Sequence, residues 1–226
     1  MKEGRDFVIV NRINNHFDDL KDDLLSIDSF DDFVTNKERR RAILFDFLQI
    51  GELTNQLSKT FRESFNNKDA DRLIAIRNRI VHGYSTIRDD IIFNTLKNQL
   101  STFVDELNSF SRNYYQEQLK KLIGKRVKVF IDRPIGYVHE NIIYPINYGY
   151  IEELTALDGE FQDVYVVDES KAIKEPVVGY AAAIIHRTDD IEDKLVVLIH
   201  DATISDKEIE EKVVFQEKYF EHKIIR

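Results

Sequence analysis

The stretch EQLKKLIGKRVKVFI, residues 117–131, marks the change from one kind of structure to another. Before Gly124 the apolar residues have helical spacing, whereas residues 127–131 form a β-branched and aromatic run typical of a strand. Gly124 is the expected hinge, because glycine adopts turn conformations that other residues avoid. We therefore predict two domains of different class, residues 1–118 and 119–226.

Composition separates the same two parts. Residues 1–120 carry a net charge of −2 and residues 121–226 a net charge of −7, and the second part holds all three prolines and five of the eight glycines. A segment poor in Pro and Gly can form long helices, and one that collects them forms turns. The acidic balance argues against extended nucleic-acid binding, DNA included, but leaves room for a small basic site.

The absence of cysteine narrows the chemistry further. It removes disulfides, thiolate metal sites and cysteine nucleophiles, and it is typical of a reducing cytoplasm. No apolar run approaches the length of a membrane span, and charges interrupt the apolar residues at the start of the chain. We expect a cytoplasmic protein with no signal peptide and no membrane segment.

The first half has the period of helices. Apolar residues recur at steps of three and four in residues 7–24, 43–57, 73–76 and 92–107. The last of these runs is expected to continue as one long helix to residue 119. Turn and cap residues lie between the runs, so the pattern predicts an antiparallel bundle of four or five helices.

Residues 77–84, RNRIVHGY, are the unusual segment of this bundle. An imidazole and a guanidinium suit RNA cleavage without a metal, because His82 can move the 2′-hydroxyl proton while Arg77 stabilises charge on the phosphate. Positions five apart on a helix differ by about 140° in direction, so joint action requires a helix end between them or a second subunit. The simpler alternative is that Arg77 and His82 cap helix carbonyls and that Tyr84 only packs.

The pattern Arg77-x4-His82-x-Tyr84 resembles the signature of the HEPN superfamily, specifically the HepT-like toxins of two-gene HEPN–nucleotidyltransferase systems. Residues 49–53, QIGEL, resemble the Ile-Gly-Glu helix of that family. The resemblance implies a homodimeric bundle that cleaves RNA with Arg77 and His82, with Asn78 beside them. It also implies that a partner nucleotidyltransferase, the antitoxin, silences the toxin by attaching AMP to Tyr84.

The second half has the pattern of a small β-barrel with a closing helix. β-Branched and aromatic runs occur at residues 127–131, 163–167, 177–185 and 195–199. Short loops join them, which favours an antiparallel barrel over a parallel sheet. The apolar positions of residues 206–220 predict the helix that closes the barrel.

Two acidic loops in this half form a candidate metal centre. Residues 158–163, DGEFQD, place three acids in one turn, and residues 189–194, DDIEDK, place four acids and a lysine in a hairpin loop. Side by side, their charges would repel unless divalent cations bridged them, and Mg²⁺ prefers such oxygen ligands together with phosphates. The alternative is that each loop is a solvated hairpin tip.

A second resemblance rests on these loops. Residues 144–151, YPINYGYI, followed by the turn at 158–163, resemble the core of the class I inorganic pyrophosphatases, whose pattern is Tyr-Pro-x-Asn-Tyr-Gly-Tyr-Ile and then Asp-Gly-Asp-Pro-x-Asp. It implies an OB-like barrel that hydrolyses pyrophosphate with several Mg²⁺ ions. The metal ligands that it implies are Asp158, Asp163, Asp189 and either Glu192 or Asp193. The phosphate-binding residues that it implies are Tyr148, Lys194 and Tyr219.

Three departures from the pyrophosphatase pattern bear on activity. Glu160 falls at the position of the catalytic base, where the family has Asp, and a displacement of about 1 Å can cost about a hundredfold in rate. Phe220 stands where the family has Lys. A strand with further ligands is missing, and Asp132 and Arg133 are the candidates to replace part of it.

Together the two halves predict a bifunctional protein, a HepT-like ribonuclease toxin fused to a Mg²⁺-dependent pyrophosphatase-like hydrolase. Its expected ligands are RNA, pyrophosphate and the partner nucleotidyltransferase. Two alternatives stay open. The C-terminal domain could bind pyrophosphate or a nucleotide without turnover, and the helical half could serve assembly alone.

Overall fold

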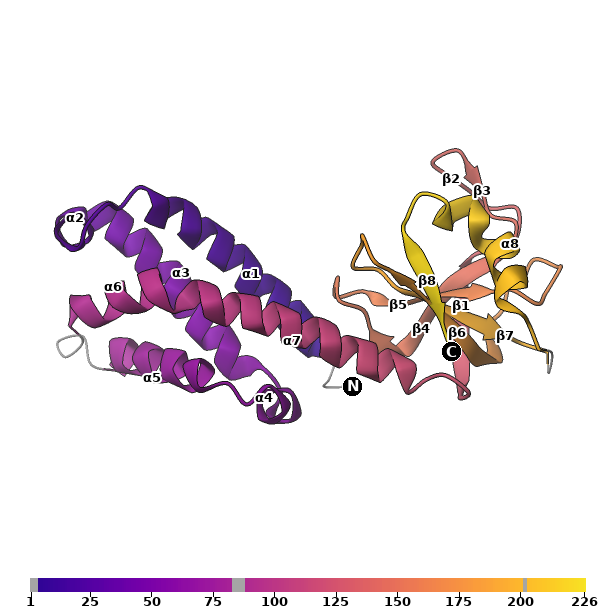
Figure 1. Cartoon of the computed structure of the whole chain (residues 1–226), viewed down its shortest axis with the longest axis horizontal. Coiled ribbons are helices and arrows are strands. Elements are labelled where there is room, and N and C mark those ends of the chain that lie inside the picture. The colour runs from indigo at the N-terminus through magenta and orange to yellow at the C-terminus, as the bar shows by residue number, and fades with distance from the viewer. Residues whose placement is uncertain (1–3, 83–87, 201–202) are drawn as a thin grey trace. The chain divides into compact units, whose positions relative to one another are not determined.

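The computed structural model describes residues 4–82, 88–200 and 203–226 (Figure 1). The chain divides into two compact units, Lys2–Arg112 and Asn113–Arg226. No helix in the described ranges combines the length and apolarity that a membrane crossing needs. The predicted pairing of a helical bundle with a β-barrel and a closing helix is confirmed.

The first unit is built from helices. They are α1 (Gly4–Leu25), α2 (Phe30–Thr35), α3 (Lys37–Gln56), α4 (Lys59–Phe65), α5 (Lys68–His82), α6 (Asp89–Asn98) and α7 (Leu100–Lys120), the last of which continues into the second unit. The side chains of Ser29, Asn36 and Ser58 cap α2, α3 and α4 by accepting backbone N–H groups. α3 packs against both α1 and α5, so it lies at the centre of the bundle.

The long helix expected through residues 92–119 is in fact two helices. α6 ends at Asn98 and α7 begins at Leu100, with Gln99 between them at φ −128° and ψ −34°. Leu96 and Leu100 are both buried. The apolar residues on either side of the break are therefore both inside the bundle.

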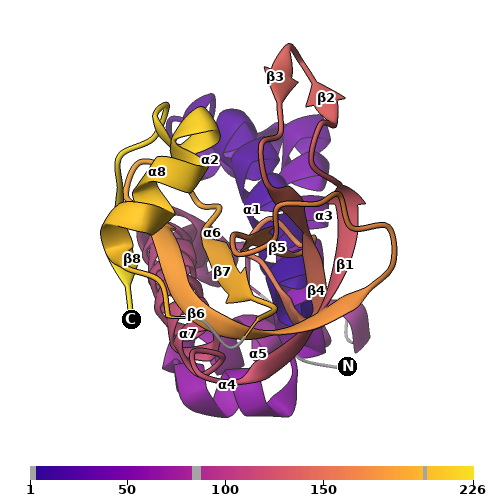
Figure 2. The same cartoon turned by 90° about the vertical axis from the view of Figure 1, so that its right-hand side faces the viewer.

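The second unit is a closed barrel. Its elements are β1 (Arg126–Arg133), β2 (Val138–His139), β3 (Ile142–Ile143), β4 (Asn147–Thr155), β5 (Phe161–Val166), β6 (Val177–Arg187), β7 (Lys194–Leu198), α8 (Asp206–Glu217) and β8 (His222–Ile225). The strand order β1-β4-β5-β7-β6 closes on itself because β6 also pairs with β1, and β8 adds to the edge of β6 (Figure 2).

One pairing corrects the expectation of an antiparallel barrel, because β5 and β7 run parallel. The cause is the connection after β5. Residues 167–176 carry the chain past the place of β7 to form β6 first, and β7 then returns antiparallel to β6 and fills the gap beside β5.

Close contacts inside the barrel fix its shape. A Cβ atom on Gly149 would lie 1.9 Å from the carbonyl oxygen of Phe130, so β1 and β4 approach each other at a distance that only glycine permits. α8 covers the barrel core, where Ile209 and Val213 join the cluster that includes Tyr148.

Candidate functional site

The motif residues of the helical unit lie on α5 where it packs against α3. The Arg77 guanidinium forms an ion pair with Glu52 on α3, and its Nη1 donates a hydrogen bond to Asn78 Oδ1 at 2.9 Å. Gly51 allows this close packing, because a Cβ atom there would lie 2.8 Å from the Cβ of Arg77. The Gly-Glu pair of α3 therefore positions the motif arginine, whose side chain stays 22% exposed.

α5 runs without interruption from Lys68 to His82. Arg77 and His82 thus occupy one helix, at backbone positions about 140° apart. No helix end lies between them. Of the two conditions under which Arg77 and His82 could act together, a helix end between them or a second subunit, only the second subunit remains. The side chain of His82 and the whole of Tyr84 lie outside the described residues.

In the barrel unit, a buried lysine joins three of the predicted site residues. The side chain of Lys194 at the start of β7 is 1% exposed. Its ammonium donates to Asp163 Oδ2 at 2.5 Å, to Glu192 Oε2 at 2.8 Å and to the Tyr148 hydroxyl at 3.2 Å. Burial raises the pKa of Tyr148 far above its usual range, and the Asp163 charge adds to the rise.

The acidic turn lies next to this lysine. Asp158 Oδ1 accepts a hydrogen bond from the Glu160 backbone N–H at 2.9 Å, in a turn that Gly159 permits with φ +92°. Partial burial raises the pKa of Asp158, and the charges of Glu192 and Asp163 raise it further. Because Lys194 of one acidic loop contacts Asp163 of the other, the two loops lie side by side.

The end of β1 completes this cluster. Arg133 Nη1 donates to the Tyr144 hydroxyl at 2.5 Å, and its guanidinium lies 5.2 Å from the ring centroid of Tyr148. Burial raises the pKa of Asp132. The positive charge of Arg133 opposes this rise, and the negative charge of Asp163 adds to it. Both residues thus lie close enough to the cluster to contribute charge to it.

Asp193, by contrast, is enclosed in a separate hydrogen-bond network. Its Oδ1 lies 2.9 Å from His186 Nδ1 and accepts from the Arg187 N–H at 3.1 Å, and Gln116 Nε2 at the end of α7 donates to its Oδ2. Burial raises the pKa of Asp193, although His186 and Gln116 oppose the rise. These contacts leave Glu192 as the carboxylate of this pair that contacts Lys194.

Tyr115 and Gln162 extend the same network. Tyr115 on α7 is fully buried, and its hydroxyl donates to Gln162 Oε1 at 2.5 Å. Gln162 Nε2 in turn donates to the Asp193 carbonyl at 2.7 Å. Burial raises the pKa of Tyr115 well above its usual range, and the Asp193 charge adds to it. The last turns of α7 therefore hold the loop that precedes Lys194.

Two further predicted residues lie near the start of β8. Asp189 Oδ2 accepts the Glu221 N–H at 3.0 Å, and Tyr219 is 64% exposed with the Lys218 ammonium 4.9 Å from its ring centroid. Among the described residues, neither Asp189 nor Tyr219 forms a hydrogen bond or ion pair with Lys194.

A buried arginine in the barrel has no signal in the sequence pattern. Arg187 Nε and Nη2 donate to the two oxygens of Glu217 at 2.9 and 2.8 Å, and Nη1 donates to Asp190 Oδ2 at 2.9 Å. Burial lowers the pKa of Arg187, but Glu217 and Asp190 raise it on balance. Its guanidinium also lies 3.5 Å from the ring centroid of Phe220. Arg187 therefore joins β6 to the end of α8, through Glu217, and to the segment between α8 and β8, through Phe220.

His16, Asp19 and Asp46 form a second unpredicted group. Their ligand atoms lie within 4.8 Å of one another, and no other group of three such residues occurs among the described residues. His16 Nδ1 lies 2.9 Å from Asp46 Oδ1. The two residues are 30 positions apart on different helices, so no spacing rule could have paired them.

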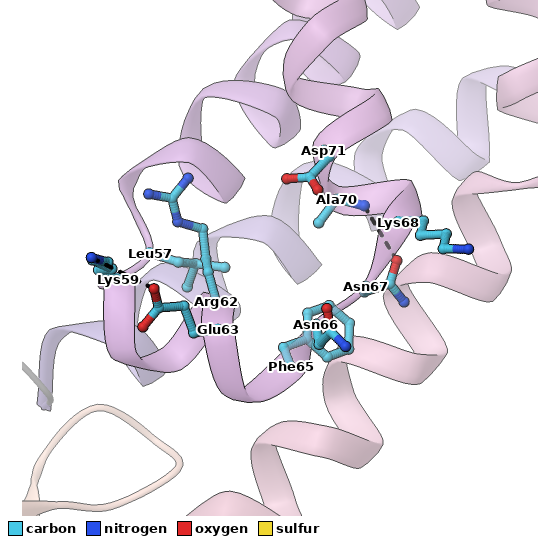
Figure 3. Close-up of a pocket in the computed structure, with 10 residues that line it drawn as sticks. All are labelled: Leu57, Lys59, Arg62, Glu63, Phe65, Asn66, Asn67, Lys68, Ala70 and Asp71. Carbon is cyan, nitrogen blue, oxygen red and sulfur yellow. Dashed lines mark hydrogen bonds and ion pairs between the residues drawn. The ribbon is translucent and has the colours of Figure 1, made fainter.

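A surface pocket of about 400 Å³ lies between α4 and the start of α5 (Figure 3). Its charged lining consists of Lys59, Arg62, Glu63, Lys68 and Asp71. The lining contains both cations and anions, so it lacks the single sign of charge that would select an anionic ligand.

The bundle and its motif helix define a HEPN-type helical domain. The sequence of residues 13–126 matches the family model described as "Ribonuclease HepT-like", and since the match covers half of the chain, the protein belongs to this family. Among curated proteins, no sequence matches the chain.

Solved structures similar to part of the chain are inorganic pyrophosphatases. The enzyme from Ehrlichia chaffeensis is 14% identical with a TM-score of 0.37, over 45% of this chain and 85% of that one. The enzyme from Helicobacter pylori is 17% identical with a TM-score of 0.35, over 42% and 75%. The enzyme from Neisseria gonorrhoeae is 19% identical with a TM-score of 0.34, over 42% and 74%.

Proposed function

We propose that the protein is a cytoplasmic bifunctional hydrolase, whose helical half cleaves RNA and whose barrel half hydrolyses a pyrophosphate bond with Mg²⁺. The observation that carries the second activity is the Lys194 ammonium, buried between Asp163 and Glu192 and bonded to Tyr148. Burying a charge is costly unless it is paired. A fold that maintains such a group at the edge of an acidic cluster is suited to binding a phosphate together with a cation.

The carboxylates of this cluster have the chemistry of Mg²⁺ ligands. Asp163 and Glu192, from the two acidic loops, both contact the Lys194 ammonium, and their charges raise the pKa of Asp158. These three residues would hold the ion, with Asp189 as a further ligand supplied by the same loop as Glu192. Bound Mg²⁺ would supply charge neutralisation for the phosphate oxygens.

Each remaining residue has a distinct task. Lys194 and Arg133 would bind phosphate oxygens, and the Tyr148 hydroxyl would donate a hydrogen bond, because its raised pKa keeps it protonated. Tyr219, which is exposed, would also bind phosphate. Glu160 at the acidic turn would accept a proton from the attacking water.

The helical half would cleave RNA as a homodimer. Because α5 does not end between Arg77 and His82, the two side chains would act together across two copies of the chain. Arg77 would stabilise the phosphate charge, Asn78 would orient Arg77, and His82 would move the 2′-hydroxyl proton. A partner nucleotidyltransferase would silence this activity by attaching AMP to Tyr84, and the barrel would hydrolyse the pyrophosphate released in that reaction.

Phosphate release from pyrophosphate in the presence of Mg²⁺ tests the barrel half. We expect the full-length protein to release phosphate and Asp163→Asn to lose at least about a hundredfold in rate. Glu175→Gln, at an exposed position of the same unit, is the matched control and should retain the rate. No release by the wild type, or equal release by Asp163→Asn, would show the activity to be absent.

RNA cleavage, read as growth arrest on expression and as cleavage in vitro, tests the helical half. We expect Arg77→Ala and His82→Ala to abolish both, and Arg72→Ala, an exposed arginine on the same helix, to abolish neither. Growth arrest that persists in His82→Ala would support the alternative in which the helical half serves assembly alone.

A second candidate for the barrel is binding without turnover. The extra methylene of Glu160 favours it, because it displaces the carboxylate at the position proposed for the base. Mg²⁺-dependent pyrophosphate binding with no phosphate release would support this candidate.

A further inference from the structure

Three aromatic rings from three neighbouring strands stack in a row on the barrel. The Phe130 and Tyr150 centroids are 5.5 Å apart with 14° between the ring planes, and the Tyr150 and Phe161 centroids are 5.4 Å apart with 11° between the planes. The Lys128 ammonium lies 4.8 Å from the Phe130 centroid and covers that end of the row. Phe161, at the other end, is 45% exposed.

This aromatic row adjoins the acidic cluster on the same face of the sheet. Tyr150 lies directly opposite Asp163 in the β4–β5 pairing. Phe161 precedes Asp163 by two residues on β5, and side chains two apart on a strand point to the same face at a separation of about 7 Å. A phosphate bound at Asp163 and Lys194 would therefore have the exposed ring of Phe161 roughly one sugar unit away.

The geometry of the row differs from that of the barrel core. The buried rings of Tyr144, Tyr148 and Tyr165 meet edge to face, with interplanar angles of 62° and 61°. That arrangement is common where aromatic rings fill a core. The row that ends in exposed Phe161 is instead nearly parallel, which is the arrangement that a nucleobase can extend by one more layer. Cross-strand packing alone would not require Phe161 to remain so exposed.

We propose that the aromatic row and the acidic cluster form one site for a nucleoside polyphosphate such as ADP. The phosphates would lie at Lys194 and the carboxylates, and the base would stack on the exposed ring of Phe161. This assignment rests on the phosphate chemistry proposed above for the cluster, and it names a substrate class that carries a base as well as a phosphoanhydride.

Hydrolysis of ADP at this site needs water as its only other reactant. The oxygen of water bonds to one phosphorus, the bridging phosphorus–oxygen bond breaks, and the leaving phosphate keeps the bridging oxygen. A water proton passes through Glu160 to the solvent or to the leaving group, so that ADP and water give AMP and phosphate without a further reactant.

ADP and pyrophosphate form a matched pair of probes, because they share the phosphoanhydride and differ in the nucleoside. With the full-length protein and Mg²⁺, we expect ADP to have the lower KM. Phe161→Ala should raise the ratio of the KM for ADP to that for pyrophosphate by roughly 5- to 150-fold, the range that base stacking spans. Phe161→Tyr should restore the ratio, and Tyr180→Ala, an exposed aromatic on β6, should leave it unchanged.

Equilibrium binding of the same probes, measured by calorimetry, separates this inference from the hydrolase proposal. If neither probe is hydrolysed but ADP binds more tightly than pyrophosphate and loses that advantage in Phe161→Ala, the nucleoside subsite stands and the hydrolase proposal fails. If pyrophosphate is hydrolysed but ADP has no advantage, or keeps it in Phe161→Ala, the nucleoside subsite is overturned and the hydrolase proposal stands. Melting temperatures of all variants confirm that they are folded.

Discussion

At the residue scale, Arg187 illustrates how much the barrel depends on one buried charge. Its side chain is 1% exposed and that of Glu217 is fully buried, so each compensates the desolvation of the other. Arg187 also contacts the ring of Phe220, the position at which the pyrophosphatase pattern has a lysine. In this chain Phe220 packs against the buried guanidinium of Arg187.

We predict that Arg187→Ala lowers the free energy of unfolding by about 3–5 kcal/mol, because it leaves Glu217 buried without a counter-charge. Urea denaturation of the full-length protein measures this loss. The double variant Arg187→Ala/Glu217→Gln should regain part of it, since no unpaired charge then remains. A loss below about 1 kcal/mol in the single variant would mean that water reaches Glu217.

Sequence patterns located the acidic loops but left Glu192 and Asp193 as equal candidates. The structure distinguishes their contacts, since Glu192 bonds to Lys194 while Asp193 accepts from Gln116, 77 positions earlier in the chain. A local motif carries no information about so distant a partner. The same holds for His16 and Asp46, and for Arg187 and Glu217, whose pairing depends entirely on tertiary structure.

At the element scale, β-branched runs correctly located β1, β5, β6 and β7, and the apolar pattern located α8. β2, β3, β4 and β8 were not predicted as strands. β4 contains Gly149 and ends in polar residues, and β8 is a four-residue segment held by its pairing with β6. Strands of this kind are set by their neighbours more than by their own propensity.

The last turns of α7 are expected to control the loop that carries Glu192 and Lys194. Gln116→Ala removes a donor to buried Asp193 and should cost about 1–3 kcal/mol of unfolding free energy. Pyrophosphate affinity should fall about tenfold, because the loop loses its anchor. Gln118→Ala, on the same helix, is the control, and calorimetric titration with Mg²⁺ present is the measurement. Unchanged affinity in Gln116→Ala would show that pyrophosphate binding does not depend on this hydrogen bond.

The connection between α8 and β8 should be sensitive to pH through His222. Burial lowers its pKa, but Glu210 at 2.9 Å and the Phe220 carbonyl raise it more, so the folded value lies above the ordinary 6.5. Glu217 adds to the rise. A raised pKa means that the folded state binds the proton more tightly than the unfolded state.

This stabilisation is therefore fully present below about pH 6.5 and is lost as the pH rises through the folded pKa. We predict that the difference in melting temperature between the wild type and His222→Gln shrinks between pH 6 and pH 8.5. A difference that stays constant over this range would indicate that His222 does not titrate with the fold.

At the scale of the whole molecule, composition alone identified two halves of different class, because Pro, Gly and acidic residues collect in the second. The negative charge of that half includes the two acidic loops, so part of the net charge of the chain belongs to the candidate site. The near-neutral half holds the Arg-His motif, and the overall acidity of the chain was no guide to it.

The two proposed activities should be separable. We predict that Asp163→Asn abolishes phosphate release but keeps RNA cleavage, and that His82→Ala has the reverse effect, because the two sets of residues lie in different compact units. Both assays on both full-length variants test this. Loss of both activities in either variant would show that one half requires the other in order to function.

The position of Tyr115 and Gln116 has a consequence for how such a protein can arise. Both belong to the helix that closes the ribonuclease-like bundle, within the segment that matches its family, yet their hydrogen bonds serve the barrel. A recombination event that cut the gene at the end of α7 would deliver a barrel without the anchors of its own loop. We expect a barrel that begins at Asn113 to keep these anchors and one that begins after α7 to lose them.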